Sequence, residues 1–167
     1  MKAYRFVIVY IVLVLVQIVL CNFLNLSRYV VLSYLPVLIL MLPLRWRTIP
    51  LMAFAFALGF TVDFFSTGML GLTSLALVPV AVTRGLVVAG MFGDELGARE
   101  GELSLSRFGI PKYILAVLLL CAVYFFFYVW ADSAGTMGFW QCALRFFLSV
   151  LVSTPVCIFI ATILRPE

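Results

Sequence analysis

Histidine is absent from this sequence of 167 residues, and charged residues are scarce. Only 11% of the chain is charged and 66% is hydrophobic, whereas a soluble domain carries about 25% charged residues. A chain with so little charge cannot cover a surface that faces water, so we expect an integral membrane protein. The net charge of +4 includes no block of basic residues, and binding to nucleic acid is therefore not expected.

Cysteine is also sparse and never clustered. Four cysteines stand singly in apolar segments, at positions 21, 121, 142 and 157. There is no CxxC spacing, and without histidine no mixed Cys/His group can form to hold zinc, haem or an iron–sulfur cluster. We expect free thiols that pack as small apolar side chains, with no metal and no cofactor.

Apolar runs fill most of the chain. A transmembrane helix needs about 20 apolar residues, which leaves room for about six spans. The first run is longer than the apolar core of a signal peptide and shows no small-residue cleavage site, so it is interpreted as a retained helix. We predict a single all-α membrane domain over residues 1–167, with a polar cytoplasmic loop at 91–110 and spans at approximately 6–26, 29–44, 49–65, 69–90, 111–130 and 139–164.

The positive charges set the predicted topology. With the amino terminus in the cytoplasm, only Arg28 falls in the outer loops. The positive-inside rule therefore places both termini in the cytoplasm. The charges on the cytoplasmic side are then Lys2, Arg5, Arg45, Arg47, Arg99, Arg107, Lys112 and Arg165.

One carboxylate interrupts the apolar runs. Asp63 lies near the end of the third predicted span, within the stretch Gly59–Leu75. An aspartate at the centre of a transmembrane helix costs about 3 kcal/mol on insertion scales, so an intramembrane carboxylate is by default a functional-site hypothesis. Gly68, Gly71 and Ser74 follow at spacings of three. We expect these small residues to form a face on which helices approach closely.

Three further polar residues lie within apolar runs. Asp63 is about 14 residues, or roughly 21 Å, from the cytoplasmic start of its span, and Arg145 is about six residues, or roughly 9 Å, from the outer start of the last span. Both lie toward the outer leaflet, and we predict that they form an ion pair. Arg84 lies nearer the cytoplasmic half, and its side chain is expected to extend toward the inner surface. Gln17 is interpreted either as a hydrogen-bonding partner of a neighbouring helix or as a tolerated buried polar residue.

The sequence leaves two alternatives for Asp63. The carboxylate can lie at the outer end of its helix, where it reaches lipid headgroups or helps to cap the turn to Ser66 and Thr67. It can also form a catalytic dyad with Asp132, the only other acid on the outer side, which resembles the chemistry of lipoprotein signal peptidases. The surrounding motifs of that family are absent, and an aspartate alone is not expected to catalyse hydrolysis within a membrane. We therefore expect a protein that is not an enzyme.

The residues around Asp63 also form a pattern: a glycine, the aspartate, two apolar residues, a small polar turn and a Gly-Leu pair. In this chain the pattern is Gly59-x-x-x-Asp63-Phe64-Phe65-Ser66-Thr67-Gly68-x-x-Gly71-Leu72-x-x-Leu75. It resembles the junction of two helices in the rod shape-determining protein MreD family. Chain length, a retained first helix and cytoplasmic termini are similar too, whereas the polar loop at 91–110 has no match in that family.

The resemblance implies a non-enzymatic inner-membrane protein of the bacterial elongation machinery, embedded in membrane lipid. Such proteins associate with the single-span scaffold MreC and, through it, with MreB filaments, RodA and a class B penicillin-binding transpeptidase. Their helices resemble those of the substrate-binding subunits of energy-coupling-factor transporters. A small-solute carrier of the vitamin type is therefore the alternative function, and it would need a pocket with several convergent polar groups.

Overall fold

The computed structural model describes residues 3–23, 30–42, 47–66, 69–96, 110–133 and 138–163, and this part of the chain is all-α. Its helices are α1 (Ala3–Phe23), α2 (Leu35–Leu40), α3 (Thr48–Phe65), α4 (Leu72–Leu96), α6 (Ile110–Asp132) and α7 (Phe139–Ile163).

Four of these helices, α3, α4, α6 and α7, are long and apolar enough to cross a membrane. The apolar stretch Val7–Phe23 of α1 is a shorter candidate. Large apolar side chains are exposed along the helices, as contact with lipid requires, and Phe56, Phe60 and Phe64 form one such stripe on α3. The prediction of an all-α polytopic membrane protein is confirmed.

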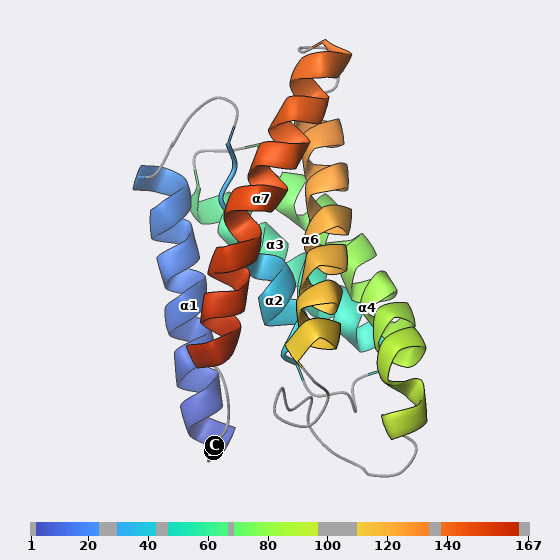
Figure 1. The fold of residues 1–167 in the computed structure, drawn as a ribbon. Coiled ribbons are helices and arrows are strands. Elements are labelled where there is room, and N and C mark those ends of the chain that lie inside the picture. Colours follow the sequence, from blue (N-terminus) through green and yellow to red (C-terminus); the bar gives the residue numbers. More distant parts are fainter. Residues whose placement is uncertain are drawn as a thin grey trace.

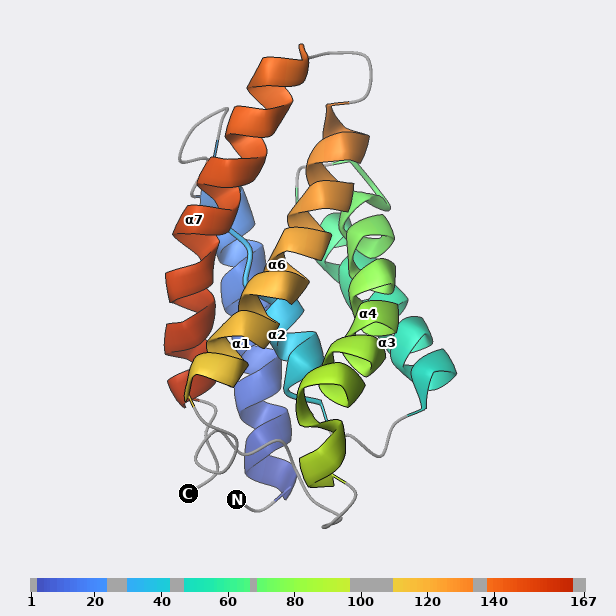
Figure 2. The same cartoon turned by 45° about the vertical axis from the view of Figure 1, so that its right-hand side comes forward.

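The long helices surround α2 (Figure 1). Along the chain α3 packs against α4, α4 against α6, and α6 against α7, while α2 contacts α1, α4, α6 and α7. α1 and α3 run in the same direction, so the chain that connects them must cross back through the bundle. Residues 30–42 make this crossing, which we call the second pass (Figure 2). We call the end of the bundle where α1 begins and α7 ends the terminal end, and the end where α6 stops the hairpin end.

The second predicted span, 29–44, is not a helix of membrane length. Residues 30–34 are non-helical, and only the six residues of α2 form a helix in this pass. Pro36 explains the break, since in a continuous helix its ring would clash with the carbonyl of Leu32. It lies instead in the first turn of α2, where proline is tolerated. The second pass through the bundle is therefore made partly by backbone outside any helix.

The remaining predicted spans are close to the observed helices. α3, α6 and α7 begin and end within two residues of their predicted limits, and α1 lies three residues earlier than predicted. α4 differs most, because it starts at Leu72 rather than at residue 69 and continues to Leu96. The predicted loop at 91–110 therefore begins as helix, and its residues 97–109 lie outside the described part of the chain.

The core of the protein is centred on α2. All of its residues are buried, and all except Pro36 belong to one apolar cluster with Leu77 of α4 and with Leu120 and Phe125 of α6. In lipid, helices gain no hydrophobic energy by associating, so close packing and hydrogen bonds must hold them together. The polar contacts inside this bundle therefore decide how its helices are arranged.

Candidate functional site

Asp63 lies in the last turn of α3, with only 3% of its surface exposed. Its carboxylate accepts hydrogen bonds from backbone N–H groups at the start of α4. Oδ2 accepts from Gly71 at 3.0 Å, from Thr73 at 2.9 Å and from Ser74 at 3.4 Å. Oδ1 shares the Thr73 N–H at 3.2 Å. Asp63 therefore caps the helix that follows its own.

This cap explains how the bundle tolerates a buried carboxylate. The first N–H groups of a helix have no partner within it, and an unmet polar group in hydrocarbon costs several kcal/mol. A negative charge at this position also interacts favourably with the positive end of the helix dipole. Gly71 precedes α4 with φ +92°, a backbone conformation that favours glycine. It places its own N–H on Asp63 as the chain turns into the helix.

The small residues near the junction divide into two kinds. We predicted that Gly71 belongs to a helix-contact face. The structure contradicts this prediction, because a Cβ added at Gly71 would meet nothing within 4 Å. Ser74 does make a close contact, since a Cβ on Gly59 of α3 would lie 2.6 Å from the Ser74 Cα and N atoms. Ser74 also donates a hydrogen bond to the Phe56 carbonyl at 3.2 Å. Gly68 lies outside the described residues.

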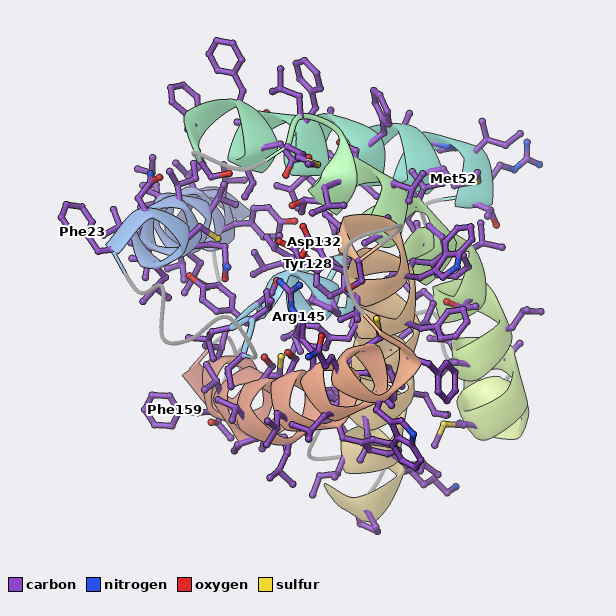
Figure 3. All side chains as sticks on the ribbon, turned by 90° about the horizontal axis from the view of Figure 1, so that it is seen from above. Phe23, Met52, Tyr128, Asp132, Arg145 and Phe159 are labelled. Carbon is purple, nitrogen blue, oxygen red and sulfur yellow. The ribbon has the colours of Figure 1, made fainter. Side chains whose placement is uncertain are left out.

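Arg145 pairs with Asp132, so the predicted pair of Arg145 with Asp63 is wrong. Its Nη1 lies 2.5 Å from Asp132 Oδ2, and the two side chains are 11% and 25% exposed respectively. Both residues flank the same hairpin between α6 and α7, whereas Asp63 is engaged by the start of α4. Figure 3, which looks from the hairpin end, shows Tyr128, Asp132 and Arg145 directed to the space enclosed by the helices.

Arg84 does not extend to the inner surface, contrary to our prediction. It is 3% exposed within α4, and its Nη2 donates a hydrogen bond to the Leu42 carbonyl, just after α2. Leu42 follows Met41, the residue that caps the carboxyl end of α2. The buried guanidinium therefore ties the chain that leaves this short helix to α4.

Gln17 of α1 binds the non-helical backbone of the second pass. Its side-chain amide donates to the Leu32 carbonyl at 3.2 Å and accepts the Tyr34 N–H at 3.3 Å. The Tyr34 hydroxyl donates in return to the Leu13 carbonyl at 2.6 Å. Gln17 therefore forms interhelix-type hydrogen bonds of the kind that we considered for it, but its partner is a non-helical segment and not a helix.

Two serines of α7 hold the same segment from the other side. Ser149 accepts the Val31 N–H at 3.0 Å, and Ser153 accepts the Ser33 N–H at 3.3 Å. Backbone outside a helix is tolerated at membrane depth only where the protein itself satisfies its polar groups or where water reaches it. Neither serine was among the predicted site residues, although their spacing of four places them on one helix face.

The acids of the alternative catalytic dyad have separate partners, because Asp63 caps α4 and Asp132 pairs with Arg145. An aspartate dyad requires two adjacent carboxylates that share a proton. In the described ranges, no group of three or more side chains is placed to hold a metal ion. All four cysteines are free thiols, as predicted.

No protein-family model, curated protein or solved structure matches this chain. The fold and the site define a class: an all-helical, membrane-embedded protein whose second pass is broken. Among its described residues, Asp63 and Arg84 bind backbone groups and Arg145 pairs with Asp132, whereas the Nε atoms of both arginines have no hydrogen-bond partner.

Proposed function

We propose that this chain is a scaffold of the bacterial cell-elongation machinery, of the MreD type, and that it acts by binding other membrane helices. The α3–α4 junction is the observation that carries the proposal. Gly59, Asp63 and Gly71 belong to the pattern on which the resemblance rests, and each has a structural part in the junction. The pattern therefore builds a fixed helix pair, which suits a protein that presents a surface to partners.

The engaged acids support a role in binding over a role in catalysis. The Asp63 carboxylate accepts three backbone N–H groups, and Asp132 is paired with Arg145. A general acid or base must be free to exchange a proton with a reacting group. Neither carboxylate has that freedom in this arrangement, so the proposed function is non-enzymatic.

The proposed direct partner is MreC, through its single membrane span. MreB filaments, RodA and a class B penicillin-binding transpeptidase are reached through that scaffold. Helices associate in lipid by close packing and interhelical hydrogen bonds, and this chain exposes long apolar helix faces. The proposed location is the bacterial inner membrane with both termini in the cytoplasm, which is consistent with α1 beginning and α7 ending at the same end (Figure 2).

Depletion of the chain in a rod-shaped host, together with pull-down of a tagged copy, tests this proposal. We expect the depleted cells to become round and the tagged chain to retain MreC. A Gly59→Leu variant, which forces α3 and α4 apart, should neither restore rod shape nor retain MreC. The matched control Gly85→Leu adds the same side chain at an exposed position of α4 with nothing within 4 Å of the new Cβ, and it should behave as the unmodified protein.

Two results would contradict the proposal. Cells that stay rod-shaped after depletion, with MreC absent from the pull-down, exclude a scaffold of this kind. A vitamin-like solute that co-purifies tightly with the chain, in cells whose shape does not depend on it, supports the alternative carrier.

A further inference from the structure

The Nε–H donor of the Arg145 guanidinium is not used by its ion pair. Asp132 is bound through Nη1, whereas the buried Nε has no hydrogen-bond partner in the described part of the structure. Leaving a buried donor unmet costs about 1–3 kcal/mol, and more when the group is charged. The ion pair therefore leaves the burial of the Nε–H group of Arg145 unexplained.

The unused atom belongs to the edge of the guanidinium that is suited to oxyanions. Nε and the adjacent Nη2 point the same way, and together they bind two oxygens of a carboxylate or a phosphate in a fork. Asp132 approaches Nη1 on another side of the group. An incoming oxyanion can therefore bind the fork without displacing Asp132.

Tyr128 adds a hydroxyl group to the same place. It lies one turn before Asp132 on α6, so the two side chains project from the same face of that helix. Figure 3 shows the three side chains together on the inner side of α6 and α7. A phenol can donate a hydrogen bond to a third oxygen of a phosphate group.

The pair can be reached from the hairpin end of the bundle. The Asp132 side chain is 25% exposed and Arg145 is 11% exposed. Nε itself is covered, so the flexible side chain must turn its fork toward the exposed end when an oxyanion arrives.

We propose that Arg145 and Tyr128 form a binding site for an oxyanion group, a phosphate ester or a carboxylate, at the hairpin end of the bundle. The group is carried either by the headgroup of an anionic lipid or by a free solute. Asp132 keeps the guanidinium at the hairpin end through Nη1 and limits the affinity through its own negative charge. This site is independent of the proposed scaffold function, because the oxyanion binds without a partner protein.

The test uses the full chain in an uncharged maltoside detergent, with two probes. Native mass spectrometry measures the binding of dioleoyl phosphatidylglycerol against dioleoylglycerol, which has the same acyl chains and no phosphate. Thermal unfolding measures the stabilisation by inorganic phosphate against chloride at equal ionic strength, since a ligand that binds the folded state raises the unfolding midpoint. Retention of the phospholipid identifies a lipid source, and a shift with phosphate alone identifies a free oxyanion.

Arg145→Lys is the decisive variant, because lysine preserves the charge opposite Asp132 but has no fork. Binding of the responding probe should fall about tenfold or more, as expected for the loss of a hydrogen bond to a charged group. Arg47→Lys, at an exposed position beside the start of α3, is the control for general attraction to headgroups and should bind normally. Equal binding by the unmodified protein and Arg145→Lys with both probes, or no binding of either probe, would overturn the proposal.

Asp132→Asn provides a second test if Arg145→Lys does not fold. Removing the competing carboxylate should tighten binding of the same probe, whereas a purely structural ion pair predicts lower stability and no gain in binding. Weaker or unchanged binding by Asp132→Asn would also overturn the proposal.

Discussion

One methyl group added at the contact between α3 and α4 should destabilise the whole bundle. The Gly59→Ala variant places a Cβ 2.6 Å from the Ser74 Cα and N atoms and 2.9 Å from the Thr73 carbonyl carbon. Non-bonded carbon atoms prefer separations of about 3.5–4.0 Å, so the helices must move apart by about 1 Å. Each contacted atom belongs to the backbone and cannot rotate away. Such overpacking costs about 1–3 kcal/mol, and the same shift lengthens the hydrogen bonds that Asp63 accepts.

The free energy of unfolding, measured by titration with a denaturing detergent in mixed micelles, checks this value. Gly85→Ala, on the partner helix α4, is the matched control, because its new Cβ meets nothing within 4 Å. That control should keep or raise stability, by up to about 1 kcal/mol, through its better helix propensity. If Gly59→Ala is as stable as Gly85→Ala, then α3 and α4 do not pack as described and the reasoning about the junction is refuted.

Two other contacts predict the direction in which named substitutions change stability. The double variant Asp132→Arg with Arg145→Asp should restore the stability that each single variant loses, about 2 kcal/mol for a partly buried pair. The double variant Asp63→Arg with Arg145→Asp should not restore it. Thermal unfolding of the three single and two double variants distinguishes the two pairs, and restoration by the second double variant would contradict the assignment. Gln17→Leu leaves two backbone groups of the second pass unmet and should cost about 2–4 kcal/mol, with faster hydrogen exchange at the Tyr34 N–H; unchanged exchange there would show that Gln17 does not hold the segment.

Sequence alone predicts the long helices well, because their apolar runs are continuous and their ends carry polar or turn residues. α3, α6 and α7 match to within two residues for this reason. The second pass was predicted wrongly, since its composition is as apolar as a helix and only Pro36 distinguishes it. A proline in the middle of a short apolar run removes one hydrogen bond and excludes the preceding turn. The backbone groups of the residues before Pro36 then need hydrogen-bond partners outside a helix, and Gln17 and the two α7 serines supply them.

The charged residues were harder to pair, because a similar depth in the membrane does not reveal a partner that lies close in sequence. Asp63 and Arg145 lie at similar predicted depths, yet each has a nearer partner across a short turn. The N–H groups of the following helix are invisible to a search for opposite charges. A carboxylate that ends one helix shortly before the next begins should therefore be tested first as a cap for that second helix. Arg84 illustrates the same point just after α2, where its partner is a carbonyl.

The central claim is that Asp63 acts as a structural cap in a binding protein, and restoration of rod shape by two variants in depleted cells tests it most directly. Asparagine keeps an acceptor oxygen that can replace Oδ2, which accepts hydrogen bonds from all three backbone N–H groups. Asparagine also caps helices about as well as aspartate. Ala removes the acceptor and leaves those groups unmet. The account predicts that Asp63→Asn restores rod shape and that Asp63→Ala does not. Failure of Asp63→Asn, with the protein present at its normal level, would show that the negative charge or its proton is required and would contradict the account.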